Sequence, residues 1–525
     1  MQASPERLLE APALVLVLAI TALRSISTED VQFYDETSYL ASGLAIRNGD
    51  LPGFTAGATY ADFYFLLSRL TADPVGLYFA GRATAAVLLV LGVWVSARLL
   101  SNSSLAWVAA AVVAASPMPY VWPGVAAPAA GLILAGVSLA IRFPGPASLG
   151  AGSAMVWLAA GARPELAWVA AVWSVTSLVA LVGAFRARRP GLVGAVVGVA
   201  FGAFAVPAAL LVLHGSPFSS SGREWIAFQQ HFSLRHVTDG LDPWLDSAAI
   251  VSQFFPGAGS VSEAILTSPG AFASHVGSNL LEAPLVIVRD VLGIQSGDVA
   301  ALIGMAMAVT VLSSMALALV LDLDASRSRA LRVWTGLRAR SRWGAWVGLA
   351  AILMSIVLSV SLVYPRHHYL LVPAAGIIVG AVAVQHHVGS SRLTAILPIT
   401  AAVVLFALLS MQMARLAITR AAYPAPVAAT ITRMIESGQD WRLLGGSQGL
   451  PIYVPRLQEV TDAQPLPDES FIELLDRLAI STVLTGSTET SAWASMPGFG
   501  EFIDDPTQYG FESPFAGSQL WLRSP

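Results

Sequence analysis

The sequence predicts a polytopic α-helical membrane protein with about eleven transmembrane helices and a small α/β domain at its C-terminal end. Of the 525 residues, 55% are hydrophobic and only 12% are charged, whereas about 25% of the residues of a soluble domain are charged. Long apolar segments recur up to about residue 413, and the composition then becomes polar. These features indicate a transmembrane domain at 1–413 and a separate domain at 414–525.

A membrane-spanning helix needs about 20 mostly apolar residues, because each residue adds 1.5 Å along an axis that must cross ~30 Å of hydrocarbon. The segments that meet or approach this condition are 8–27, 76–99, 104–120, 124–143, 148–162, 166–185, 191–213, 298–322, 343–363, 369–388 and 393–413. The first segment has a short apolar centre, as a secretory signal has. Because further spans follow it, we expect an uncleaved helix there.

Arginine-rich loops predict the orientation, since cytoplasmic loops carry an excess of basic residues. A basic cluster at 186–189 and a basic run at 327–342 fall on alternate loops. The N-terminus is therefore expected in the cytoplasm, in a multi-pass protein of the cell (inner) membrane. Loops 28–75 and 214–297 and the domain at 414–525 are then expected on the non-cytoplasmic side.

Composition excludes several classes of function. The net charge of -4 argues against binding nucleic acid through bulk electrostatics. The chain has no cysteine, and its sequence shows arginine but no lysine. Disulfides, thiolate metal sites and Schiff-base chemistry are therefore excluded. An arginine-only basic composition with abundant alanine and glycine suggests a prokaryotic source.

The first polar segment after the first span carries two adjacent carboxylates, Asp35 and Glu36. A helical pattern follows, with Leu40 and Leu44 one turn apart and Gly49 placed to end it. Asp35 is a candidate catalytic base, because an unperturbed aspartate with a pKa of about 3.9 is ionised at neutral pH. In the alternative interpretation, Asp35 only caps the helix that begins there.

Further charged residues assigned to the same side come from separate loops near span ends. They are Arg163, Glu165, Arg366, His367 and His368. Arginine binds phosphate through paired hydrogen bonds, and a lipid phosphate lies at the headgroup level, so these residues could hold a lipid-phosphate donor. In the alternative interpretations, Arg163 and Glu165 form a local ion pair, the 366–368 segment anchors to headgroups, and Arg82 is structural.

Metal dependence stays open from the sequence. The long loop at 214–297 contains His231, His236, Asp239 and Asp242, but their spacing fits no strong ligand pattern. Oxygen atoms of Asp35, Glu36 and Asp62 could hold a hard divalent cation, although no spacing requires it. Aromatic residues of the same long loop predict interfacial amphipathic helices.

The C-terminal domain shows short strand-like segments and one helical pattern. We expect strands at 442–444, 452–454, 482–484 and 519–522, and a helix at about 470–478. Gly445-Gly446-Ser447 follows the first strand without the full spacing of a dinucleotide-binding motif.

Several of these motifs resemble those of a known family. Asp35-Glu36-Thr37-Ser38-Tyr39 followed by Gly49-Asp50-Leu51 is similar to the first outer loop of the GT-C glycosyltransferases. The protein O-mannosyltransferase and lipid A aminoarabinose transferase superfamily is the most similar group. The other segments that resemble this family are Gly81-Arg82-Ala83, Arg163-Pro164-Glu165 and the stretch from Arg366 to Pro373.

The resemblance implies a polyprenyl-phosphate-linked sugar donor and inverting transfer of a hexosyl or pentosyl group on the non-cytoplasmic face. It implies that Asp35, with Glu36 beside it, supplies the base or positions the acceptor or a metal. Arg366 and Arg163, with His367 and His368, would hold the donor phosphate. Possible supporting residues are Tyr39, Arg82, Glu165 and Asp62. The acceptor could be a glycan, a lipid or a protein.

The chain also departs from the family pattern. The Pro-Pro pair that often ends the first loop is absent, and Thr59-Tyr60-Ala61-Asp62-Phe63 stands near that place. The neighbouring lysine of aminoarabinose transferases is missing too, which argues against lipid A as the acceptor. Polytopic architecture alone also permits a transporter or lipid flippase, which predicts inverted repeats, or a scaffold that binds partners through its outer domain.

Overall fold

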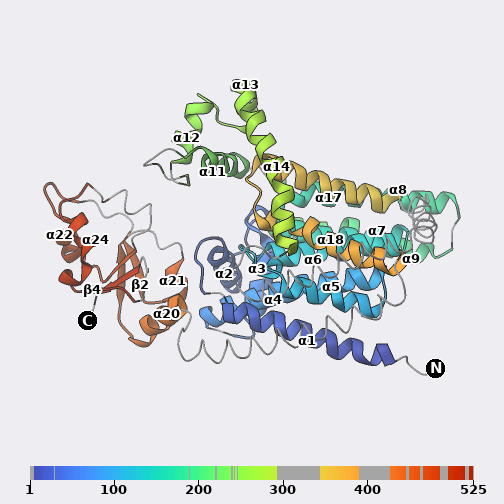
Figure 1. Cartoon of the computed structure of the whole chain (residues 1–525), viewed down its shortest axis with the longest axis horizontal. Helices are drawn as coiled ribbons and strands as arrows, with labels where there is room; N and C mark the ends of the chain where they lie inside the picture. Colours follow the sequence, from blue (N-terminus) through green and yellow to red (C-terminus); the bar gives the residue numbers. More distant parts are fainter. Residues whose placement is uncertain are drawn as a thin grey trace.

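The computed structural model describes residues 5–292, 343–388 and 426–523, apart from short gaps at 29, 72, 189, 219–221, 238–240, 242, 245, 445–448, 461–464, 485–492, 494 and 515–519. Within this part, seven helices are long and apolar enough to cross a membrane. These helices support a multi-pass membrane protein. A small five-stranded sheet follows near the C-terminus. The predicted fold class is therefore confirmed (Figure 1).

Nine of the predicted spans fall on described residues, and each coincides with a helix. They are α1 (Pro5–Thr28), α4 (Pro74–Leu100), α5 (Ser103–Ala115), α6 (Ala126–Arg142), α7 (Pro146–Ala162), α8 (Ala167–Arg186), the continuous run α9 (Leu192–Val199), η5 (Ala200–Ala205) and α10 (Val206–His214), α17 (Trp343–Leu362) and α18 (His367–Val388). The predicted spans at 298–322 and 393–413, and the basic run at 327–342, lie outside the described residues.

The long loop predicted at 214–297 contains four helices: α11 (Arg223–His236), α12 (Ser247–Phe254), α13 (Val261–Thr267) and α14 (Pro269–Leu292). Sequence analysis did not predict that α14 is long and apolar enough to cross a membrane. Its polar residues His275, Asn279 and Glu282 interrupt the apolar pattern. Figure 1 shows α14 running steeply across α18 rather than alongside it. Ala283 and Val286 pack there against Val360 and Leu370 of the bundle.

Small residues let the bundle helices approach closely, as is typical of membrane helix packing. A Cβ atom on Gly92 of α4 would collide with the backbone of Gly131 of α6. The ring of Trp173 in α8 is fully buried between Gly152 of α7 and Gly348 of α17. These contacts explain why glycine occupies helix interiors, where it otherwise lowers helix stability.

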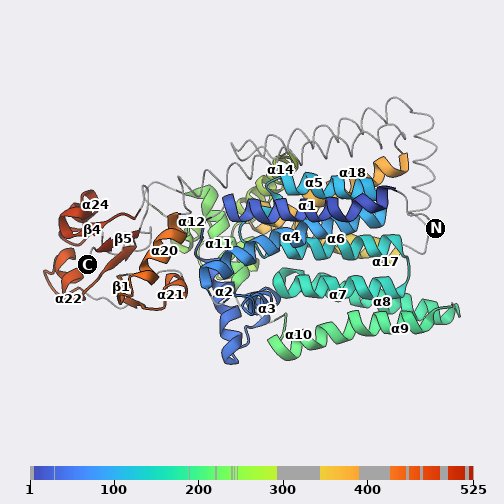
Figure 2. The same cartoon turned by 90° about the horizontal axis from the view of Figure 1, so that it is seen from below.

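The connections that carry the candidate residues gather at one end of the bundle, here called the loop end. This end holds α2 (Asp35–Ala45), η1 (Ile46–Asn48), η2 (Phe54–Ala56), α3 (Ala58–Leu67), η3 (Met118–Tyr120) and η4 (Pro164–Leu166). The C-terminal domain lies at the same end, beyond α2 and α11 (Figures 1 and 2). The convergence expected from the arginine-rich loops is thus present, while its sidedness relative to the cytoplasm stays a prediction.

The C-terminal domain is built on a sheet with the strand order β2-β1-β3-β5-β4. The strands are β1 (Trp441–Leu444), β2 (Leu457–Val460), β3 (Thr482–Leu484), β4 (Phe511–Glu512) and β5 (Leu520–Arg523). The first three in spatial order are parallel, and β5 is antiparallel to both β3 and β4. Its helices are α20 (Pro426–Glu436), α21 (Leu450–Tyr453), α22 (Phe471–Arg477), α24 (Phe499–Asp504) and η7 (Pro506–Tyr509).

One strand predicted in this domain is wrong. Residues 452–454 belong to α21 and its C-cap, and β2 follows at 457–460. Leu450, Tyr453 and Val454 are buried together, and their spacing of three and four residues is helical. Pro451 is also suited to the first turn of a helix. The other predicted strands and the helix at 470–478 are confirmed, and Ser470 caps that helix reciprocally with Glu473.

Candidate active site

Asp35 is the first residue of α2 and is solvent-exposed at the loop end. The preceding residue, Tyr34, occupies the N-cap position with φ 73° and ψ -125°, and its side chain makes no capping hydrogen bond. The capping position is therefore Tyr34 and not Asp35. A carboxylate in the first turn is favoured by the positive end of the helix. Asp35 thus lies at a helix start and remains accessible to solvent.

Glu36, the next residue, faces the interior of the protein and is fully buried. Its Oε1 accepts hydrogen bonds from the hydroxyls of Tyr60 (2.6 Å) and Tyr64 (2.5 Å), and its Oε2 accepts one from the backbone N–H of Gly124 (2.8 Å). The two tyrosines lie one turn apart on α3, so they face the same side. Burial and the Glu36 carboxylate raise the pKa of both tyrosines well above its usual value, which keeps their hydroxyls protonated as donors.

Arg82 of α4 completes this buried network. Its guanidinium donates to the carbonyl oxygens of Val121 (3.0 Å) and Tyr120 (3.3 Å) and lies 3.8 Å from Oε2 of Glu36. Arg82 is 4% exposed. Its contacts link α2 and α4 to the segment after η3, which agrees with the structural interpretation of this arginine.

Arg163 lies between α7 and η4 with its guanidinium over the ring of Tyr369, 4.8 Å from the centroid. Its Nε donates to Glu165 Oε1 (2.5 Å), so the local ion pair of the alternative interpretation is present. Burial disfavours the charged guanidinium, but the Glu165 carboxylate and nearby tyrosines raise its pKa above the usual value. Arg163 is therefore a fixed positive charge at the loop end.

Arg366 lies in the connection between α17 and α18, and its guanidinium stacks on the ring of Trp244, 4.5 Å from the centroid. Burial lowers the pKa of Arg366, and the nearby side chains of Tyr369 and Asp35 act in the opposite direction. The Asp35 carboxylate therefore lies within electrostatic reach of this guanidinium. An aromatic ring holds the planar cation in one orientation while its edge stays available for hydrogen bonds.

The two adjacent histidines diverge, as two neighbouring positions at a helix start must. His367 Nδ1 pairs with Oδ1 of Asp290 in α14. His368 interacts with the backbone of Trp122 and lies in the field of Arg163 and Arg366. Of the two histidines, His368 therefore lies near Arg163 and Arg366, whereas His367 connects the start of α18 to α14.

Two aromatic residues of the site, Trp244 and Tyr369, were not expected from the sequence, and each carries an arginine. His231, considered above only as a metal ligand, lies between them. The rings of Trp244 and Tyr369 lie 5.8 Å and 6.4 Å from the His231 ring. Burial, and then the Arg366 charge, lower the pKa of His231 to about 3. His231 is thus a neutral wall of the site. The sequence signals were the aromatic richness of the 214–297 loop for Trp244 and the motif from Arg366 to Pro373 for Tyr369.

A cavity of about 40 Å³ lies beside these groups, between α6, α17 and α18. Arg163, Glu165, His368 and Tyr369 line it, and the remaining lining residues are apolar or small, such as Ile133 and Ile352. A cavity of this size holds only a few water molecules. It nevertheless places an apolar crevice next to fixed positive charge.

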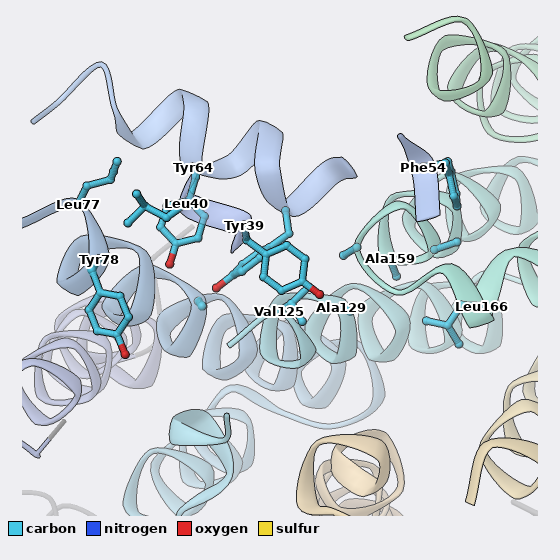
Figure 3. Close-up of a cluster of buried hydrophobic side chains, with 14 of the residues drawn as sticks. Tyr39, Leu40, Phe54, Tyr64, Leu77, Tyr78, Val125, Ala129, Ala159 and Leu166 are labelled. Atoms are coloured by element: carbon cyan, nitrogen blue, oxygen red, sulfur yellow. The ribbon is translucent and has the colours of Figure 1, made fainter. Parts of the chain in front are cut away.

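Two of the supporting residues serve the packing of the first loop. Tyr39 is buried edge-on against Tyr60, with ring centroids 5.1 Å apart, and Figure 3 shows its ring beside Val125 and Ala129. Asp62 Oδ2 lies 3.0 Å from Nε2 of His214, which joins α3 to α10. Burial raises the pKa of Asp62, and His214 opposes that shift.

A metal site is not formed by the described residues: no three of their His, Asp or Glu side chains gather in a way that could hold an ion. Asp62 pairs with His214, and Glu36 is enclosed by its donors. Asp239 and Asp242, considered with His231 and His236, lie outside the described residues.

No family model and no curated protein matches this chain. Among solved structures, the chain is similar to the oligosaccharyltransferase of Archaeoglobus fulgidus in the apo form, with 12% identity and a TM-score of 0.39, over 90% of this chain and 69% of that chain. It is also similar to ArnT from Cupriavidus metallidurans bound to undecaprenyl phosphate, with 15% identity and a TM-score of 0.38, over 98% of this chain and 99% of that chain. The likeness in both cases is distant.

Proposed function

We propose that this protein is an integral-membrane glycosyltransferase that moves a sugar from a polyprenyl-phosphate donor to an acceptor hydroxyl at the loop end. One observation carries the proposal. The exposed carboxylate of Asp35 lies at the same end of the bundle as Arg366, whose guanidinium is held on Trp244. A second guanidinium, Arg163, is fixed on Tyr369 and lines the cavity between α6, α17 and α18.

The chemistry follows from these groups. Asp35 accepts the proton of the acceptor hydroxyl while the hydroxyl oxygen forms a bond to the anomeric carbon. At the same time the bond between that carbon and the phosphate oxygen breaks. The polyprenyl phosphate leaves with the bonding electrons. Arg366 and Arg163 stabilise its negative charge, since paired guanidinium–phosphate hydrogen bonds are strong. A single displacement of this kind inverts the anomeric centre.

We assign Glu36 a different role from Asp35. A carboxylate that already accepts three hydrogen bonds in a buried setting has no access to an acceptor hydroxyl. Glu36 instead fixes the position of α2 relative to α3 and the segment after η3. Glu165 holds Arg163, and His368 extends the polar surface beside the crevice.

Donor binding is the first test, with undecaprenyl phosphate as the probe. A ligand at 100 times its Kd stabilises a protein by about 2.7 kcal/mol, so the purified protein should show a higher Tm with the lipid. Arg366→Ala should abolish that shift. Arg523→Ala is the matched control, because Arg523 also stacks on an aromatic ring, Phe511, but in the C-terminal domain. A shift of wild-type size in Arg366→Ala would remove Arg366 from the donor site.

Transfer is tested with a panel of polyprenyl-phosphate hexoses and pentoses, following release of polyprenyl phosphate in the presence of cell-envelope acceptors. Asp35→Asn should lower the rate by about 10²–10⁴, the usual contribution of a general base. Asp50→Asn changes another exposed aspartate of the same loop and should leave the rate unchanged. Full activity of Asp35→Asn would refute the assignment of the base. If no donor binds the folded wild type, a transporter or a scaffold becomes the better hypothesis.

A further inference from the structure

The C-terminal domain contacts the same short segment that leads into Asp35. These contacts involve Asp30 at its start and Thr37 just after the carboxylate pair. Two separate parts of the domain, the start of α20 and the helix α21, make them. The segment from 30 to 37 is therefore held at both ends by residues that follow the whole transmembrane domain in the sequence.

Asp30 caps the helix α20 of the C-terminal domain. Its Oδ2 accepts a hydrogen bond from the backbone N–H of Val427 (2.7 Å), and its Oδ1 accepts one from Ala428 (3.0 Å). The first N–H groups of a helix have no partner within the helix, and a carboxylate there also interacts favourably with the helix dipole. A distant residue thus supplies the cap that α20 needs.

Tyr453 of α21 makes the second contact. Its hydroxyl lies 3.2 Å from Oγ1 of Thr37, and its ring packs edge-on against Phe33 and Tyr78, with centroids 6.1 Å and 6.4 Å away. The Thr37 hydroxyl in turn donates to the carbonyl oxygen of Gln32 (3.3 Å). Thr37 therefore closes the turn by bonding back to Gln32, and it also joins the turn to the C-terminal domain.

The turn between these contacts is strained. Tyr34 has a positive φ of 73°, a backbone conformation that residues other than glycine adopt only at a cost in free energy. The Tyr34 side chain is 57% exposed. Strain of this kind persists only where the surroundings hold the backbone. The flanking contacts to the C-terminal domain meet that requirement.

We propose that the C-terminal domain acts as a latch on the Asp35 turn, with Asp30, Thr37 and Tyr453 as positioning residues. Docking of the domain holds the strained turn and thereby fixes the position of Asp35 at the start of α2. The catalytic consequence rests on the proposed function, whereas the mechanical coupling does not.

Hydrogen–deuterium exchange of the intact protein tests the coupling without any substrate. Tyr453→Phe and Thr37→Val each remove one hydroxyl, and we expect amides of residues 31–38 to exchange about tenfold faster, the factor that corresponds to ~1.4 kcal/mol. Thr37→Ser keeps the hydroxyl and should restore protection. Tyr509→Phe is the matched control, because the Tyr509 hydroxyl donates to Glu501 (3.4 Å) within the C-terminal domain.

The double variant and a second contact sharpen the test. If the two hydroxyls act on each other, Tyr453→Phe combined with Thr37→Val should behave like either single variant. Both carboxylate oxygens of Asp30 accept a hydrogen bond from α20, and Asp30→Asn keeps only one of these acceptors. The amides of Val427 and Ala428 should therefore also exchange faster. Unchanged exchange in residues 31–38 for Tyr453→Phe and Thr37→Val would overturn the latch.

Kinetics then test positioning with a donor that the wild type uses. Tyr453→Phe should lower kcat about tenfold and leave KM for the donor within about twofold, because the donor phosphate is assigned to Arg163 and Arg366, whereas Tyr453 contacts Thr37, Phe33 and Tyr78. Faster exchange with unchanged kcat would refute the positioning role. If the wild type uses no donor, the proposed function fails, and exchange alone decides the latch.

Discussion

Replacing Glu36 with glutamine tests the framework beneath the site. The amide oxygen can still accept from Tyr60 and Tyr64, but the amide nitrogen then faces the backbone N–H of Gly124 and the guanidinium of Arg82. A hydrogen bond to a charged group contributes about 1.5–3 kcal/mol, and breaking a buried charge pair costs about 3–5 kcal/mol. Because Arg82 keeps two carbonyl partners, we expect a loss of about 3 kcal/mol, at the lower end of that range.

The assay is thermal unfolding of the purified protein in detergent, with exposed Glu436→Gln in α20 as the control. At about 2 °C per kcal/mol, as for larger domains, Glu36→Gln should lower the Tm by about 6 °C, while the control should not change it. Tyr60→Phe removes a single donor and should have a smaller effect. An unchanged Tm for Glu36→Gln would contradict the claim that this carboxylate holds the first loop in place.

Three further perturbations have defined outcomes. His231→Gln should make the protein less sensitive to acid. The pKa of His231 is about 3 in the folded protein and about 6.5 in the unfolded chain, so the wild type loses stability as pH falls from 6.5, by about 2 kcal/mol at pH 5. Unfolding midpoints measured across pH will show the difference. Gly43→Ala would press a Cβ against the side chain and backbone of α3 and should cost about 1–3 kcal/mol, whereas Gly183→Ala in α8 meets nothing within 4 Å and should be neutral or stabilising in the same melting assay. Arg24→Met removes the guanidinium that donates to the carbonyl oxygens of Ala114, Ala115 and Ser116 and should lower the Tm by several degrees.

The helical part of the fold was predictable because a bilayer imposes one length and one polarity on every span. The gathering of charged loops at one end was predictable for the same reason, since charge avoids the hydrocarbon interior. The helix α14 escaped prediction because His275, Asn279 and Glu282 interrupt its apolar pattern. In the structure, Asn279 donates to the carbonyl oxygen of Ser361, and Nε2 of His275 lies 3.1 Å from the carbonyl oxygen of Leu362, both at the end of α17, so these polar side chains have partners at the loop end.

The different roles of Asp35 and Glu36 in the candidate site were not predictable from the sequence. Consecutive helical residues point about 100° apart, so the sequence shows that Asp35 and Glu36 are neighbours but not which of them faces inward. The decision depends on two tyrosines that lie 24 and 28 residues further along the chain. Likewise, nothing local to Arg366 indicates that Trp244 carries it, because that contact depends on how the loop after α10 folds back.

The cap that Asp30 supplies to α20 also has a consequence for biosynthesis. The two partners are separated by 397 positions, so at about 5–20 residues per second the ribosome needs roughly 20 to 80 s to make the second after the first. Throughout that interval the turn at Asp35 has no C-terminal domain to hold it. We therefore expect nascent chains arrested before residue 426 to be cleaved by protease in the first loop, and full-length chains to resist. Under the proposed function, a chain still under synthesis would then be inserted in the membrane without a competent site, and synthesis of the C-terminal domain would complete that site.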